Sequence, residues 1–99
     1  MSTLGNYDAI EQLIFDEKLS IEKVDFQREE ICVILNTKAS LHFPLSLFKG
    51  LAAADMSALG KYQIIAGGTG VHWPELDEDL SLKGFLQESL KQTIRNAAA

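Results

Sequence analysis

Residues 67–79 read Gly-Gly-Thr-Gly-Val-His-Trp-Pro-Glu-Leu-Asp-Glu-Asp, a stretch that the composition of this 99-residue chain does not lead us to expect. It combines three glycines, the only tryptophan, one of two histidines and one of two prolines with four acidic residues. A packed core rarely needs such a mixture, so we interpret the segment as a signature. Its glycines predict a turn with positive φ at one or more of them. A strand over 71–73 follows, and Pro74 ends it.

The segments on either side of this signature predict a strand before it and a helix after it. Residues 62–66 are typical of a strand and would form a hairpin with 71–73. Ser81 is a suitable N-cap for a helix over 82–95. The apolar stripe of that helix has helical spacing and comprises Leu82, Phe85, Leu86, Leu90 and Ile94, with Glu88 and Lys91 on its other side.

The first half of the chain predicts a helix followed by a meander. Over 6–18 the apolar residues recur every three or four positions, and Asn6 is a suitable N-cap. Val24 and Phe26 would share one face of a short strand, although Ile21 breaks the alternation. Two further strands are expected at 31–35 and 41–45, and Pro44 places the second of them at an edge or at its own end.

Residues 46–59 lose this alternation and predict one or two short helices, interrupted at Gly50 and stopped by Gly60. The expected fold is therefore α+β: an antiparallel meander of about three strands plus a C-terminal hairpin, with short central helices and a helix at each end. A chain of 99 residues suffices for one core, so we expect residues 1–99 to form a single domain.

The charge balance bears on the class of partner. The chain carries nine basic and fourteen acidic residues, a net charge of −5, and its basic residues are scattered. Nucleic-acid binding depends on Lys and Arg that neutralise phosphates, so we expect no direct nucleic-acid partner. An acidic surface suits a basic protein as the partner.

The sequence has no secretory leader pattern, and no apolar run approaches the ~20 residues of a membrane span. We therefore expect a cytoplasmic protein without membrane contact.

Each residue that could take part in binding or catalysis also has a purely structural interpretation. The glycines match neither a dinucleotide fingerprint nor a phosphate loop, because no helix or lysine follows them. His72 and His42 could hold a metal with Asp77 or Asp79 if their strands met. Otherwise His72 faces away from the core and bonds a backbone group or an acid. Cys32 lies in an apolar run, which is typical of a buried thiol, and cannot form an internal disulfide because it is the only cysteine.

Trp73 and the acids after it define the candidate partner surface. Trp73 is either a core residue whose indole N–H finds a buried partner or an exposed anchor for another protein. The acids lack the spacing of a calcium loop, and two of them would favour the dipole of the following helix. The candidate partner-binding residues are His72, Trp73, Glu75, Asp77, Glu78 and Asp79. We expect no catalytic residue, metal ligand or cofactor site, since no nucleophile has an obvious activating neighbour.

The segment from Gly70 to Ser81 resembles the glycine–aliphatic–His-Trp-Pro–x–Leu-Asp-Glu-Asp–aliphatic–Ser signature of the bacterial family called domain of unknown function 2442. The paired strands around Val33–Leu35 and Leu41–Leu45 resemble that family as well. The resemblance covers about residues 21–86, so the helices at 6–18 and 82–95 are extensions of the family-like core. Two departures stand out: the family's Asp-Gly-Arg turn is replaced by 36–39, and the arginines of its helical segment are missing.

The resemblance implies a compact α+β domain, and in some members an antitoxin-like role beside a small protein encoded nearby. We therefore expect a non-enzymatic protein-interaction domain with a small basic partner. The alternatives are a metal-dependent enzyme or metal site built on His72, His42 and the acids, and a regulatory domain that senses a small ligand. A homodimer is a further expectation, because an open meander edge and amphipathic end helices can pair.

Overall fold

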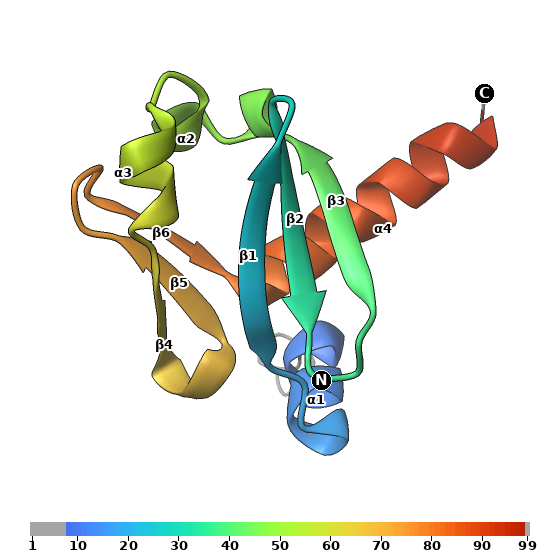
Figure 1. The fold of residues 1–99 in the computed structure, drawn as a ribbon. Helices are drawn as coiled ribbons and strands as arrows, with labels where there is room; N and C mark the ends of the chain where they lie inside the picture. Colours follow the sequence, from blue (N-terminus) through green and yellow to red (C-terminus); the bar gives the residue numbers. More distant parts are fainter. Residues whose placement is uncertain (1–7, 99) are drawn as a thin grey trace.

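The computed structural model describes residues 8–98, and over that range the chain forms two three-stranded antiparallel sheets and several helices (Figure 1). This confirms the expected α+β class, with a meander, short central helices and a helix at each end. The first sheet has the order β1 (Ile21–Gln27), β2 (Glu30–Leu35), β3 (Ser40–Pro44), and the second has the order β4 (Gln63–Ile65), β5 (Gly70–Trp73), β6 (Glu78–Ser81). The helices are α1 (Ala9–Glu17), η2 (Leu45–Leu47), α2 (Lys49–Ala52), α3 (Met56–Gly60), η3 (Ala66–Gly68) and α4 (Leu82–Ala98).

A register shift in the first sheet explains why Ile21 breaks the expected alternation. The pairing of β1 with β2 slips between Ile21 and Lys23, so Ile21 and Val24 are both buried although they are three positions apart. An extra residue of this kind turns the following side chains to the other face of the strand. The third strand is an edge strand, as Pro44 indicated.

The prediction that Gly50 interrupts the central helical segment is wrong. Gly50 lies inside α2, where a Cβ atom would overlap the carboxylate of Glu78, so glycine permits α2 to lie against β6. The interruption comes at 53–55 instead, where Asp55 caps α3 by accepting a hydrogen bond of 2.8 Å from the Ala58 amide. The last residue of α3 is Gly60, as expected.

The second sheet contains the expected hairpin of β4 and β5 and one strand that was not expected. Gly67 and Gly68 in the connecting turn have φ of 65° and 92°, which confirms the prediction of positive φ. The acids at 78–79 belong to β6, which pairs with β5, and so they do not simply lead into the helix. Ser81 both ends β6 and caps α4, since its Oγ accepts a 3.0 Å hydrogen bond from the Gly84 amide.

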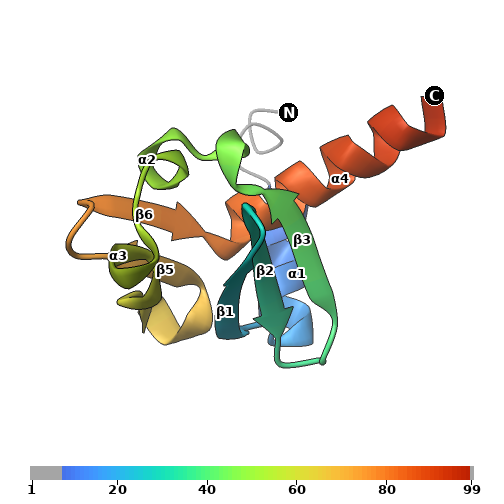
Figure 2. The ribbon, with the colours of Figure 1, turned by 45° about the horizontal axis from the view of Figure 1, so that its top comes forward.

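One hydrophobic core joins the two sheets to α4, which crosses one face of the first sheet (Figures 1 and 2). Trp73 is fully buried, its ring lies 6.4 Å from that of Phe26 in β1, and its Nε1 donates a 3.0 Å hydrogen bond to the Leu59 carbonyl of α3. The rings of Phe43 and Phe85 stack 5.7 Å apart and bring α4 against β3. Trp73 is thus the core residue that its packing interpretation predicted.

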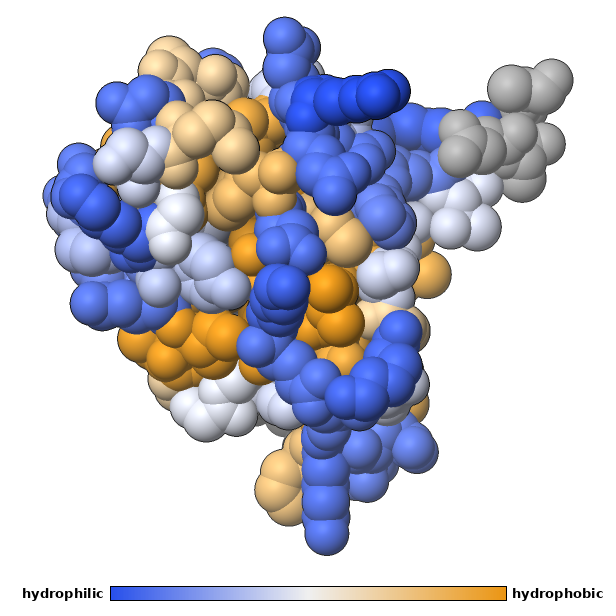
Figure 3. All heavy atoms as spheres, in the orientation of Figure 1, coloured by the Kyte–Doolittle hydropathy of each residue, from blue (hydrophilic) through white to orange (hydrophobic). Residues whose placement is uncertain are grey.

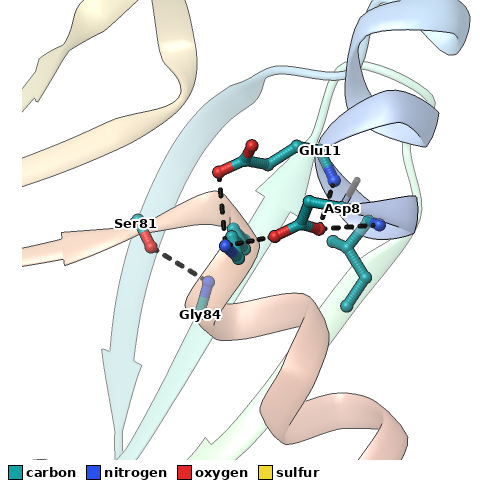
Figure 4. Close-up of polar contacts among 6 residues, drawn as sticks. Asp8, Glu11, Ser81 and Gly84 are labelled. Atoms are coloured by element: carbon teal, nitrogen blue, oxygen red, sulfur yellow. Dashed lines mark hydrogen bonds and ion pairs between the residues drawn. The ribbon is translucent and has the colours of Figure 1, made fainter. Parts of the chain in front are cut away.

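Polar contacts from α4 hold the N-terminal helix (Figure 4). Asp8 is the N-cap of α1, with 3.0 Å hydrogen bonds from the amides of Ile10 and Glu11, so the prediction of Asn6 as the cap is wrong; Asn6 itself lies outside the described residues. Lys83 pairs with Asp8 and, at 3.2 Å, with Glu11. The hydrogen bond with Lys83 lowers the pKa of Asp8, and the same bond raises the pKa of Lys83.

Over residues 8–98, the helices lack the combination of length and apolar character that crossing a bilayer requires.

Replacing Trp73 by Phe tests the buried indole. Trp73→Phe removes the hydrogen bond to the Leu59 carbonyl and leaves a cavity between the sheets. We expect the free energy of unfolding to fall by about 2–4 kcal/mol in denaturant titrations. Phe15→Leu changes an exposed aromatic residue of α1 and should cost less than about 0.5 kcal/mol. Similar losses for both variants would show that the indole does not anchor the core.

The attachment of α1 should depend on pH at both extremes. Asp8 has its pKa lowered below the ordinary 3.8, so its contribution is present above that value and is lost as the pH falls through the lowered pKa. Lys83 has its pKa raised above the ordinary 10.5, so its contribution is present below that value and is lost as the pH rises through the raised pKa.

Hydrogen exchange measures the acidic half of this dependence. Relative to the amides of β2, those of α1 should lose protection as Asp8 is protonated. In Lys83→Met the α1 amides should already be less protected at neutral pH and should change less on acidification. Equal acid dependence in both proteins would contradict this account.

Candidate functional site

The candidate partner residues lie on β5, β6 and the turn at 74–77 between them, which we call the acidic hairpin (residues 70–81). Its turn forms one end of the molecule in Figure 1, and hydrophilic residues cover this end in Figure 3. The cross-strand pairs are His72 with Asp79 and Trp73 with Glu78. Because side chains alternate along a strand, these two pairs point to opposite faces of the sheet.

His72 and Asp79 form the outward pair. The His72 Nδ1 lies 2.6 Å from the Asp79 Oδ1, and the two side chains are 30% and 69% exposed. Of the interpretations left open by the sequence, the structure matches the one in which His72 faces away from the core and bonds an acid. The contact fixes the orientation of the Asp79 carboxylate on an otherwise open surface.

Trp73 and Glu78, the inward pair, are less accessible to a partner than His72 and Asp79. Trp73 is fully buried, so its assignment to a partner-facing surface needs correction: it supports the hairpin from within. Glu78 is half-buried against Gly50 of α2. The tryptophan therefore determines where the hairpin lies, and the exposed carboxylates determine its charge.

Two further acids extend from the turn. Glu75 is exposed and forms a 2.8 Å ion pair with Lys61, and this hydrogen bond raises the pKa of Lys61 above its ordinary value. Asp77 is exposed and has a φ of 51°, a conformation that a short polar side chain tolerates better than most. Residues Glu75, Asp77 and Asp79 thus present carboxylates along one hairpin.

The structure does not bring the two histidines together. His42 lies on β3 of the first sheet and His72 on β5 of the second. Each has a carboxylate from its own sheet, Glu30 at 3.4 Å from His42 and Asp79 beside His72. Among the described residues, no group of three His, Cys, Asp or Glu side chains has the geometry to hold a metal ion.

Cys32 differs from the buried thiol that the sequence predicted. It lies on the outer face of the first sheet, half-buried, with its Sγ 3.7 Å from the Nε2 of His42. Partial burial, reinforced by the charges of Asp25 and Glu30, raises the pKa of the Cys32 thiol. A raised pKa disfavours the thiolate, which is the reactive form of cysteine.

The sequence interpretation missed a hollow of about 280 Å³ between β6 and α4. Its lining includes Phe48, Asp79, Phe85, Glu88 and Lys91. Glu88 was expected on the side of the helix away from the apolar stripe, yet its Oε1 has no accessible surface and no hydrogen-bond partner among the described residues. The i, i+4, i+7 spacing of Gly84, Glu88 and Lys91 was the available signal, because it puts a glycine beside two charges on one helical face.

Zinc titration tests the metal-site alternative directly. Among the described residues, His72 and Asp79 form a pair without a third metal-binding side chain. We therefore expect His72→Ala to bind Zn²⁺ as weakly as the unmodified protein, measured by competition with a chromophoric chelator. His42→Ala serves as the matched variant on the other sheet. A marked loss of affinity in His72→Ala alone would establish that His72 is a metal ligand.

Comparison with known proteins identifies a family for this chain. The model of the family described as "Protein of unknown function (DUF2442)" matches residues 21–90, close to the 21–86 expected from the motif. No curated protein matches the chain.

Two solved structures are similar to the chain. One is the crystal structure of a protein of unknown function from Rhodospirillum rubrum, with 32% identity over 71% of this chain and 87% of that chain and a TM-score of 0.63. The other is the solution structure of an uncharacterized protein from Chromobacterium violaceum, with 26% identity over 79% of this chain and 72% of that chain and a TM-score of 0.65. With more than half of its residues matched by the family model, the chain belongs to the DUF2442 family.

Proposed function

We propose that this DUF2442 domain is a non-enzymatic interaction module of the bacterial cytoplasm that binds a small basic protein through its acidic hairpin. The observation that carries the proposal is the exposure of Glu75, Asp77 and Asp79 on one hairpin whose backbone is anchored by a buried tryptophan. Anchoring lowers the ordering cost of binding, and concentrated charge of one sign steers a partner of the opposite sign.

The overall charge supports the same class of partner. The chain has a net charge of −5, and the ion pair with Glu75 occupies Lys61, the basic residue just before β4. A nucleic acid would be repelled by the hairpin, whereas a basic protein would be attracted. An antitoxin-like role, in which the domain neutralises a small protein encoded nearby, is the specific form of this proposal that the family resemblance implies.

Capture from the native host, with matched charge variants, tests the proposal. We expect the tagged protein to retain a stoichiometric basic protein, identified by mass spectrometry. Asp77→Asn/Asp79→Asn should slow association about tenfold at low salt, since it removes two exposed charges from the hairpin. Asp16→Asn/Glu17→Gln removes two exposed charges from α1 and should leave capture unchanged. Equal capture by both double variants, or no partner for the unmodified protein, would refute the proposal.

A second candidate function, self-association, is favoured by the edge of the second sheet. β4 is an edge strand, and its Ile64 and Ile65 are exposed in an apolar patch visible over β4 in Figure 3. An exposed apolar edge is a template for pairing with a second copy.

Light scattering of the purified protein tests this second candidate. If the edge pairs two copies, the unmodified protein should be dimeric and Ile64→Lys monomeric, because a charged edge residue opposes pairing. Met56→Lys, at an exposed apolar residue of α3, is the control and should not change the mass. A monomer without any substitution would exclude the edge as a dimer interface.

A further inference from the structure

The hollow between β6 and α4 has an aromatic floor. Phe48 and Phe85 line it, with ring centroids 5.8 Å apart and ring planes at 75°. Phe85 is buried in the core, and its ring is supported from behind by Phe43. Phe85 has almost no exposed surface, so the half-buried ring of Phe48 is the aromatic surface that faces the hollow, and Phe85 supports it.

The walls of the hollow carry more negative than positive charge. Asp79 contributes a carboxylate from β6 and Glu88 a second from α4, against one ammonium from Lys91. Lys91 reaches only the Oε2 of Glu88, at 3.6 Å, while the Oε1 of Glu88 has no hydrogen-bond partner among the described residues. Because Oε1 is shielded from solvent, a ligand in the hollow would reach Glu88 through Oε2, which in the described part of the chain is held only by the 3.6 Å contact with Lys91.

Gly84 adds an independent observation. A glycine within a helix costs about 1 kcal/mol relative to alanine. Apart from the Ser81 Oγ at 3.2 Å, no atom of the surrounding structure lies within 4 Å of a Cβ built on Gly84. A Cβ would press on the capping hydroxyl of Ser81 but would otherwise face open space, and Gly84 lines the hollow on the same helical face as Glu88. The missing side chain keeps the hollow open.

We propose that this hollow receives one arginine side chain of a partner protein, with its guanidinium between the Glu88 and Asp79 carboxylates and over the ring of Phe48. Guanidinium groups bind carboxylates through paired hydrogen bonds and stack on aromatic rings. A volume of about 280 Å³ lies just below the roughly 300–1,000 Å³ of pockets for drug-sized ligands, so it suits a single side chain. The proposal rests on the proposed function only for the source of the arginine.

A titration that needs no partner tests the site. Acetyl-arginine amide is added to the ¹⁵N-labelled 99-residue protein, and amide chemical shifts are followed. We expect millimolar binding with shifts confined to the hollow, and at least tenfold weaker binding of acetyl-citrulline amide, which has the same shape without the charge. Equal binding of the two compounds, or shifts elsewhere on the molecule, would overturn the proposal.

Three variants separate a binding role from a structural one. Glu88→Gln should weaken acetyl-arginine amide about tenfold, Gly84→Leu should abolish binding by filling the hollow, and Lys91→Met should tighten binding because it removes the competing internal cation. Glu17→Gln on α1 is the charge-matched control. Unchanged affinity in Glu88→Gln or in Lys91→Met would contradict the assignment, and the dispersion of the amide spectrum shows whether each variant is folded.

Two comparisons identify the source of the guanidinium and keep the two proposals apart. Agmatine, a free cationic metabolite, should bind no more tightly than acetyl-arginine amide. Tenfold tighter binding of agmatine would indicate that the hollow binds a small ligand and not an arginine of a partner protein. Because the titration uses no partner, arginine binding without protein capture would refute the proposed function alone. Protein capture that Glu88→Gln does not weaken would refute the arginine site alone.

Discussion

The position of Trp73 constrains the rest of the molecule. Its indole fills the space between the two sheets, contacts Phe26 of the first sheet and donates to the Leu59 carbonyl at the end of α3. Since this side chain is buried, its neighbour His72 must face outward, and the pairing of β5 with β6 then places Asp79 outward beside His72. A slip of β5 by one residue would turn the indole outward and the His72 imidazole inward. The surface chemistry of the hairpin thus follows from a packing requirement in the core.

How far the sequence predicts this fold depends on whether each signal is local. The glycine turn, the strand before Pro74 and the apolar stripe of α4 were predictable because their causes lie within a few residues. Gly50 and Ile21 were misleading because their causes are distant: one accommodates Glu78 from β6, and the other follows from a register shift against β2. β6 escaped prediction because four residues rich in acids carry little strand propensity, and only pairing with β5 makes them a strand.

The residues of the candidate site show the same contrast between local and long-range causes. The motif identified the stretch that holds the candidate residues, but the pairing of β5 with β6, which brings His72 and Asp79 together on one face, was not predicted. The motif could not separate the exposed carboxylates from Trp73, because burial depends on what the opposite sheet supplies. Glu88 was missed for the same reason, since helical spacing places it among polar residues and only the approach of β6 and Phe48 encloses it. Long-range packing, which a single sequence shows poorly, decides both cases.

Asp79 connects the two proposed binding features. Its carboxylate belongs to the exposed row of the acidic hairpin and also lines the hollow beside α4. The 2.6 Å contact with the Nδ1 of His72 engages Oδ1, so the imidazole limits how the carboxylate can turn. His72 would therefore act as a positioning residue, holding one acid where the charged hairpin meets the hollow. A partner attracted by the hairpin would place a basic side chain in the hollow without rearrangement of the backbone, because the tryptophan and the stacked phenylalanines already hold both parts in place.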